Sequence, residues 1–230
     1  PACTAGHSLG EYCAMYCSGV MNLETTLKAI QKRADLMGAT KGGAMAAILN
    51  APEGSLEKAL KEASSVGYVD VANYNSPAQV VITGDEVAVK KAGELLSEAG
   101  ARRVVPLAVS GAFHSKFMEP AGKEFSSFVS ELDMNNAETP VFTNVDAQAT
   151  VLAAEFKNKM PKQIYSSVHW TQTIENMIND GVDTFIEIGP GKVLAGLNRK
   201  INSDVKTYNI FDKDSLEATV NALKEEMAAV

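Results

Sequence analysis

Five residues near the start of the chain, Gly6-His7-Ser8-Leu9-Gly10, have the types and spacing that nucleophilic chemistry needs. Small residues typical of a strand precede them, and residues typical of a helix follow. A Gly-x-Ser-x-Gly sequence in this setting is typical of a nucleophile elbow, a sharp turn with no room for a Cβ at the glycines. We expect the Ser8 hydroxyl at the first turn of the helix, where free N–H groups stabilise negative charge. A glycine-serine turn that simply leads into a helix is the alternative.

A serine nucleophile needs a base, and the sequence contains three histidines. His114 lies among small residues in a loop at 110–115, between two predicted elements, which is the setting a base needs. His7 directly precedes the serine, so we expect its side chain to point elsewhere. His169 begins a predicted helix. His114 is therefore the candidate base, with an ordinary surface histidine as the alternative.

A cation interrupts the apolar face of the second predicted helix, which Asn22 caps and which ends at Gly38. Apolar residues recur at about 100° per residue, and we expect this stripe to face the core. The stripe consists of Leu23, Leu27, Ile30, Ala34 and Met37. Arg33 lies on its edge beside Met37, so we expect a half-buried guanidinium. From the residues alone, a snorkelling side chain or a structural ion pair explains it.

The middle of the chain has a pattern of its own. We predict strands at 44–49, 68–73, 79–83 and 103–109, and helices at 52–64 and 86–98. The order strand, helix, strand, strand, helix, strand is that of a ferredoxin-like unit. We therefore predict a small subdomain at 44–108, inserted into a larger subdomain formed by 1–43 and 109–230.

The rest of the chain alternates between helix and strand. We predict helices at 118–132, 152–159, 171–180, 193–199 and 214–229, and strands at 141–145, 183–188 and 205–211. The sequence Gly189-Pro190-Gly191-Lys192 is a strand-to-helix turn in this interpretation. It is not a phosphate loop, because the Walker pattern needs four residues between its first glycine and the Gly-Lys pair.

Composition excludes several classes of function. The 230 residues carry a net charge of −7 and no basic run, which argues against a nucleic-acid partner. No apolar stretch approaches membrane-spanning length, and the start does not resemble a signal peptide. Three cysteines without clustered histidines predict neither a zinc site nor a disulfide framework, so we expect a cytoplasmic protein. The chain starts almost inside a strand, and we expect it to be part of a larger domain.

Six blocks of sequence occur together in a recognisable order and spacing. They are residues 6–12, 31–33, 43–48, 73–82, 110–115 and 187–191. Over essentially the whole chain they resemble the malonyl-CoA:acyl-carrier-protein transacylase family. The resemblance implies an α/β fold, with an α/β-hydrolase-like core around a central parallel sheet and the inserted ferredoxin-like (βαββαβ) subdomain. It also implies transfer of a malonyl group from coenzyme A to the phosphopantetheine thiol of acyl carrier protein, through a malonyl-serine intermediate, in fatty acid biosynthesis.

The resemblance assigns catalytic roles to five residues. Ser8 would be the nucleophile and His114 its general base, with the backbone N–H of Leu9 as an oxyanion donor. The family orients its histidine with a main-chain carbonyl rather than a carboxylate, and the matching position is Gln163. Arg33 would bind the free carboxylate of malonate as a bidentate pair.

The resemblance also implies a substrate pocket and a set of partners. The pocket residues would be Phe113, Met45, Asn73 and Asn75, and the ring of Phe113 would leave little room for an α-methyl branch. The substrates would be malonyl-CoA and acyl carrier protein, with no cofactor, no metal and a monomeric enzyme. The family's Gly-Gln-Gly-Ser-Gln-type loop, which supplies a second oxyanion donor, has no counterpart in this sequence. A serine hydrolase of the same fold, a non-catalytic carrier-docking module and an inactive fragment remain as alternatives.

Overall fold

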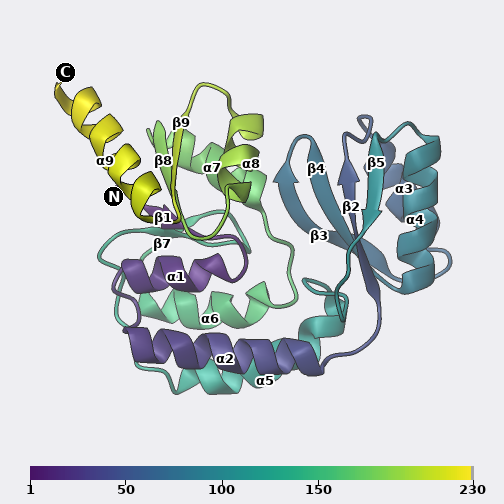
Figure 1. The fold of residues 1–230 in the computed structure, drawn as a ribbon. Helices are drawn as coiled ribbons and strands as arrows, with labels where there is room; N and C mark the ends of the chain where they lie inside the picture. The colour runs from purple at the N-terminus through teal and green to yellow at the C-terminus, as the bar shows by residue number, and fades with distance from the viewer. Residues whose placement is uncertain (229–230) are drawn as a thin grey trace. The chain divides into compact units, whose positions relative to one another are not determined.

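The computed structural model describes residues 1–228 and divides the chain into two compact units. The first unit spans residues 1–173, and the second begins at Ile174. Figure 1 shows helices and strands interleaved along the chain, as expected for a mixed α/β protein.

A four-stranded antiparallel sheet lies within the first unit. Its strands are β2 (Ala44–Leu49), β3 (Val69–Ser76), β4 (Gln79–Gly84) and β5 (Arg103–Pro106), in the order β3-β4-β2-β5. The helices α3 (Ser55–Ala63) and α4 (Glu86–Glu98) cover one face of it (Figure 1). The succession of elements is the predicted βαββαβ arrangement.

Alternation along β2 divides its side chains between the two faces of this sheet. Ala46 and Ile48 are buried against the helices α3 and α4. Met45 and Ala47 belong to a different cluster, which includes Phe113 and lies on the opposite face. One strand therefore supplies both part of the core of the βαββαβ unit and, through Met45, part of the wall of the cavity next to Ser8.

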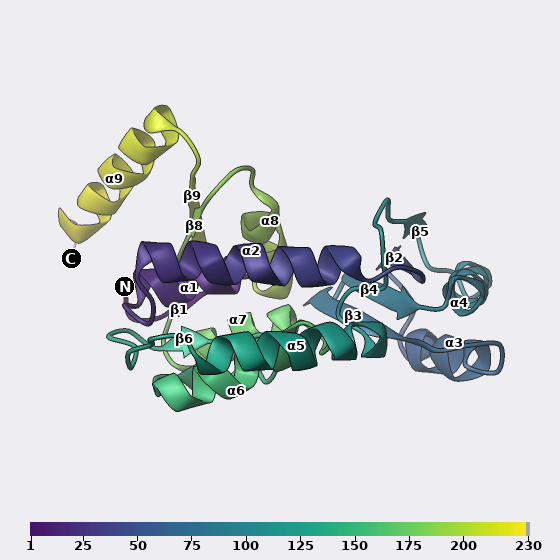
Figure 2. The same cartoon turned by 90° about the horizontal axis from the view of Figure 1, so that it is seen from below.

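The rest of the first unit is built around a small three-stranded sheet. β1 (Thr4–Ala5) pairs in parallel with β6 (Val141–Phe142), and β6 pairs with β7 (Ala149–Thr150) in antiparallel fashion. Four helices pack here: α1 (Gly10–Cys17), α2 (Leu23–Ala39), α5 (Glu119–Ser130) and α6 (Ala153–Gln163). A 3-10 turn (Lys116–Met118) leads into α5, which lies beside α2 in Figures 1 and 2.

The buried face of α2 differs from the predicted one. Asn22 caps the helix as expected, accepting a hydrogen bond from the Thr25 N–H at 2.8 Å. Leu23 and Leu27, however, are 55% and 56% exposed, and Ala34 is exposed too, so the predicted stripe was wrong at these three positions. Met37 is buried and Ile30 packs against the core, as predicted. The residues buried on α2 are Thr26, Ala29, Arg33 and Met37. This stripe is turned by about one residue, which brings Arg33 from the edge to the centre of the buried face.

Some predicted boundaries also moved. β3 continues through Asn75 to Ser76, so the turn before β4 consists of Pro77 and Ala78 only. β5 ends at Pro106 rather than at residue 109, and α6 runs on to Gln163.

The second unit contains a parallel strand pair with helices. It begins within α7 (Trp170–Asn179), and the chain continues through β8 (Thr184–Ile188), α8 (Val193–Ile201), β9 (Lys206–Ile210) and α9 (Lys213–Ala228). β8 pairs with β9. The Glu187 carboxylate accepts hydrogen bonds from the N–H groups of Leu194 at 3.1 Å and Ala195 at 2.8 Å, so it caps α8. The strand-to-helix turn predicted at 189–192 is confirmed.

None of the helices in the described part of the chain combines the length and the apolar character needed to cross a membrane.

The first prediction concerns the two glycines around Ser8. A Cβ on Gly6 would lie 1.9 Å from the backbone carbon of Gly10, whereas a Cβ on Gly10 would meet nothing within 4 Å. The expectation that neither glycine has room for a Cβ was therefore right for Gly6 and wrong for Gly10. Gly6→Ala should therefore lower the free energy of unfolding by about 3 kcal/mol or more, measured by urea denaturation. Gly10→Ala, the matched control inside α1, should change stability by less than about 1 kcal/mol and in the stabilising direction. Equal stability of the two variants would contradict the tight turn.

Candidate active site

Ser8 lies in a strained turn between β1 and α1. Its φ is +50°, in the left-handed region that non-glycine residues rarely adopt. Leu9 follows at the N-cap position of α1, and its N–H has no hydrogen-bond acceptor within residues 1–228. A free N–H at a helix N-terminus is suited to binding developing negative charge. The turn therefore has the properties of a nucleophile elbow.

The structure brings His114 to Ser8 although 106 positions separate them. His114 Nε2 lies 2.8 Å from Ser8 Oγ. On the other side of the ring, Nδ1 lies 2.9 Å from the Gln163 carbonyl oxygen and 3.1 Å from that of Ser166. Carbonyl oxygens can only accept, so Nδ1 carries the ring proton and Nε2 presents a lone pair to the serine hydroxyl. The pair is thus arranged to move the hydroxyl proton to the imidazole.

Burial keeps this imidazole neutral. His114 is 6% exposed, and its pKa is lowered to about 3, mainly by desolvation and in part by the positive charge of Arg33. The hydrogen bonds to Gln163 and Ser166 oppose this shift. A neutral imidazole is the form that can accept a proton.

Arg33 is the third functional group of the site, beside Ser8 and His114, and its side chain is buried rather than half-buried. It is 7% exposed, its Nη2 donates to Ser8 Oγ at 2.8 Å, and its guanidinium carbon lies 5.5 Å from the centre of the Tyr12 ring. Its Nε has no hydrogen-bond partner among the described residues. Burial lowers its pKa, but an arginine keeps its charge in proteins. The expectation of a half-buried side chain was wrong because the buried face of α2 is rotated by about one residue, which directs Arg33 into the core.

These groups open onto a cavity of about 400 Å³. It is lined by His7, Ser8, Arg33, Ala34, Met37, Gly38, Met45, Asn73, Leu107, Val109, Phe113 and His114. Three of the four expected pocket residues, Met45, Asn73 and Phe113, are among them. Asn75 is not, and instead its Oδ1 lies 2.8 Å from His7 Nε2.

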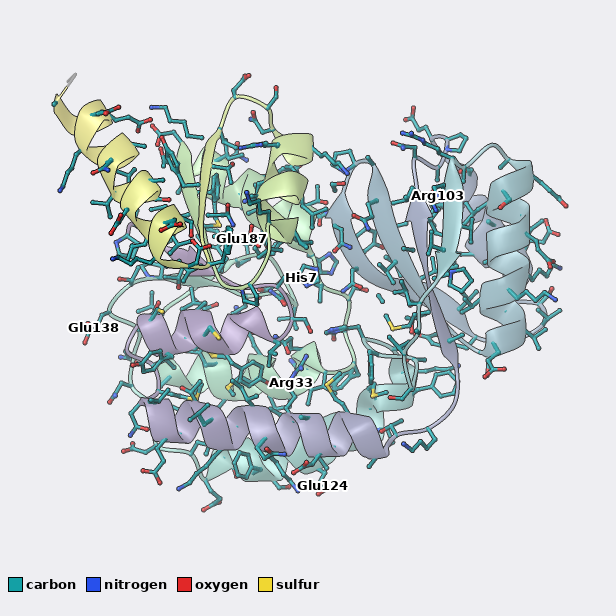
Figure 3. The ribbon with its side chains drawn as sticks, in the orientation of Figure 1. His7, Arg33, Arg103, Glu124, Glu138 and Glu187 are labelled. Atoms are coloured by element: carbon teal, nitrogen blue, oxygen red, sulfur yellow. The ribbon has the colours of Figure 1, made fainter. Side chains whose placement is uncertain are left out.

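His7 lies in the site, contrary to expectation. Its ring lines the cavity and packs against Trp170, with the ring centres 5.6 Å apart, and burial lowers its pKa. Figure 3 shows His7 on the turn after β1, and Arg33 projecting from the side of α2 that faces α1. The prediction failed because a left-handed residue at position 8 redirects the chain, so alternation of neighbouring side chains does not apply.

Sequence reasoning missed two buried polar residues beside the elbow. Asn144 is fully buried, and Glu11 is 1% exposed. The Glu11 Oε2 accepts from the Asn144 N–H at 2.6 Å, and burial raises the pKa of this carboxyl group to about 7. The only signal in the sequence was an acidic residue directly after the Gly-x-Ser-x-Gly pattern. Asn144, in a short predicted strand, gave none.

Among the residues that the structure describes, no group of three or more His, Cys, Asp or Glu side chains is placed to hold a metal ion.

The chain is similar to known proteins both as a domain family and as individual relatives. The model of the acyl transferase domain family matches residues 1–226. The malonyl CoA-acyl carrier protein transacylase of Bacillus subtilis is 40% identical over 230 residues, which cover 98% of this chain and 73% of that protein. The Haemophilus influenzae protein of the same name is 39% identical over 221 residues, covering 95% and 71%.

Solved structures agree with the sequence comparison. An acyl carrier protein S-malonyltransferase from Vibrio cholerae has a TM-score of 0.92 at 40% identity, covering 95% of this chain and 72% of that one. A malonyl CoA-acyl carrier protein transacylase from Clostridium perfringens has a TM-score of 0.95 at 36% identity, covering 100% and 73%. The chain therefore belongs to the malonyl-CoA:acyl-carrier-protein transacylase family of acyl transferase domains. The predicted α/β fold class is confirmed.

The second prediction follows from the low pKa of His114. Because the ring stays neutral as the pH falls, the rate constant for modification of Ser8 by a neutral sulfonyl fluoride should drop less than about threefold between pH 7.5 and 5.5. An imidazole with the ordinary pKa of about 6.5 would lose about tenfold over this range. Circular dichroism at each pH checks that the protein stays folded. A tenfold loss centred near pH 6.5 would contradict the buried, neutral imidazole.

Proposed function

We propose that the protein is a malonyl-CoA:acyl-carrier-protein S-malonyltransferase that works through a malonyl ester of Ser8, in fatty acid biosynthesis. The observation that carries this proposal is the line of contacts from Ser8 Oγ to His114 Nε2 and from His114 Nδ1 to the Gln163 carbonyl oxygen. Family membership supplies the donor and the acceptor, since the relatives are named for malonyl-CoA and acyl carrier protein.

The first half-reaction transfers the malonyl group to the serine. Ser8 Oγ attacks the thioester carbonyl carbon as His114 Nε2 takes the hydroxyl proton. The tetrahedral intermediate then collapses, the carbon–sulfur bond breaks, and the imidazolium returns the proton to the leaving thiolate of coenzyme A. The Gln163 and Ser166 carbonyls stabilise the charged ring while it holds the proton.

The second half-reaction reverses these steps with a new thiol. The phosphopantetheine thiol of acyl carrier protein gives its proton to His114 and attacks the ester carbonyl carbon. The bond to Ser8 Oγ breaks, and the serine recovers its proton from the imidazolium. The Leu9 N–H is the proposed donor to the oxyanion in both halves, which its place at the start of α1 supports. The route uses only this chain and its two substrates, so it requires no cofactor.

Arg33 is the proposed binding group for the free carboxylate of the malonyl group. Its buried guanidinium, with an Nε that lacks a partner, can form a bidentate pair with a carboxylate at the cavity wall. An acyl group without a carboxylate leaves this charge unpaired, and that penalty is several kcal/mol. Asn73, Met45 and Phe113 complete the proposed pocket, and the Phe113 ring disfavours an α-methyl branch. Asn75 supports the pocket through His7.

The division into subdomains belongs to the same proposal. Residues 44–108 form a small subdomain and residues 1–43 with 109–230 a larger one, and the βαββαβ sheet with its own helix-covered core supports the first of these. Met45 and Asn73 would come from the small subdomain, and Ser8, Arg33 and His114 from the larger one. The substrate pocket would then lie where the two meet within the first unit.

The third prediction tests the covalent intermediate. After incubation with malonyl-CoA, intact-mass analysis should detect a malonyl adduct on the wild-type protein and none on Ser8→Ala. His114→Ala should form the adduct about 10²- to 10⁴-fold more slowly, because the general base is lost. An adduct that survives Ser8→Ala would reject the proposed nucleophile. Rapid hydrolysis without transfer to acyl carrier protein would favour a serine hydrolase.

The fourth prediction tests the carboxylate site. Arg33→Ala should slow malonyl loading of Ser8 at least about 100-fold, since the buried ion pair is worth several kcal/mol, and should change acetyl loading only a few-fold. Arg33→Lys is the control, because it keeps the charge and loses the planar fork. The measurement is the single-turnover loading rate with each acyl-CoA. An equal loss for both acyl groups would contradict the assignment.

A further inference from the structure

Two side-chain amides hold the peptide groups of Ser8 from both sides. The Ser8 N–H donates to Asn144 Oδ1 at 2.7 Å. The Ser8 carbonyl oxygen accepts from Gln163 Nε2 at 2.9 Å. Both amide residues are fully buried, and they lie 136 and 155 positions further along the chain. The backbone of the nucleophile is therefore held by tertiary contacts and not only by its own turn.

The orientation of the Asn144 amide is fixed by its other contacts. Its Nδ2 donates to the Gly6 carbonyl oxygen at 2.8 Å, so its Oδ1 must face the Ser8 N–H. Its own N–H donates to Glu11 Oε2, and its carbonyl oxygen accepts from the His169 N–H at 3.0 Å. The residue is thus tied to both ends of the elbow and cannot rotate without losing several buried hydrogen bonds.

Ser8 needs such support because of its conformation. A non-glycine residue at a φ of +50° is unfavourable and persists only where its surroundings impose it. If Ser8 relaxed to a negative φ, its Oγ would leave the position 2.8 Å from His114 Nε2. The two amides satisfy the Ser8 N–H and C=O in the strained conformation, so relaxation would also leave buried polar groups unpaired.

We propose that the side chains of Asn144 and Gln163 form an amide clamp that fixes the backbone of Ser8 and thereby positions its hydroxyl for reaction. Both are positioning residues, since they act through Ser8. This inference rests on the proposed function only where it names malonyl-CoA as the substrate of Ser8.

Gln163 gives the clamp a second effect. Its main-chain oxygen accepts from His114 Nδ1 while its side chain donates to Ser8, so a single residue contacts both members of the reacting pair. The end of α6 therefore fixes the base relative to the nucleophile. The two contacts use different atoms of Gln163. A substitution of its side chain therefore removes the hydrogen bond to Ser8 and keeps the main-chain oxygen that orients His114.

Asn144→Ala and Gln163→Met test the clamp, the second with little change of volume and with the main-chain oxygen kept. The readout is the rate constant for labelling of Ser8 by a fluorophosphonate probe, followed over a range of probe concentrations. Each variant should lower the maximal labelling rate 10- to 100-fold, because a small displacement of a reacting atom has effects of this size. The half-saturating probe concentration should change less than threefold. Loading by malonyl-CoA should slow in parallel.

Thr26→Val is the matched control. It removes one buried hydrogen bond, from Thr26 Oγ1 to the Asn22 carbonyl oxygen at 2.9 Å, in a residue that is 3% exposed and does not contact the elbow. Its labelling rate should stay within twofold of the wild type. Circular dichroism and thermal unfolding give the folded fraction of each variant, and rates are normalised to it. The two clamp variants alter different elements, so either one alone tests the proposal.

The clamp would be overturned if the normalised maximal labelling rates of the two clamp variants equalled that of the wild type. It would also be overturned if the variants changed only the half-saturating probe concentration. A wild-type protein that reacts with the fluorophosphonate but not with malonyl-CoA would reject the proposed function and leave the test of the clamp intact.

Discussion

The contact between Ser8 and His114 depends on backbone conformations that neither residue would adopt alone. Both residues have a positive φ, +50° for Ser8 and +54° for His114, so both ends of the 2.8 Å contact lie in strained loops. Hydrogen bonds with buried partners oppose the strain. The Gln163 carbonyl oxygen and Asn144 Oδ1 accept, and Gln163 Nε2 donates. The core around α1, α5 and α6 keeps these partners in place. The site is therefore a property of the packed unit and not of the Gly-x-Ser-x-Gly sequence.

Electrostatics in the cavity follow from the same burial. A guanidinium, an imidazole and a carboxyl group are all buried beside Ser8, and the cation of Arg33 is the permanent charge among them. It favours the neutral form of His114 and opposes the rise in the pKa of Glu11 to about 7. The arrangement suits a reaction in which the base starts neutral and negative charge is brought in by the substrate.

The two faces of the βαββαβ sheet pack against different parts of the molecule, because side chains alternate between the faces along each strand. On one face, Ala46, Ile48 and Ile82 pack against α3 and α4. On the other, Met45 and Ala47 pack near Phe113, whose carbonyl oxygen accepts from Thr83 Oγ1 at 3.0 Å. The loop that carries His114 is thus hydrogen-bonded to the sheet face that carries Met45 and Ala47. The position of this loop therefore depends on the sheet.

Local sequence determined the elbow, the cap at Asn22, the βαββαβ succession and the turn before α8, because each depends on residues close together in the chain. The family blocks also led to the fold class and to Ser8, Arg33 and His114. Only the tertiary structure decided that α2 buries Arg33 and exposes Leu23 and Leu27, since helix rotation depends on what packs against it. It also brought His7 into the cavity and Asn144 under Ser8. These placements arise from contacts between segments far apart in the chain, or from a single left-handed residue, and neither leaves a periodic signal in the sequence.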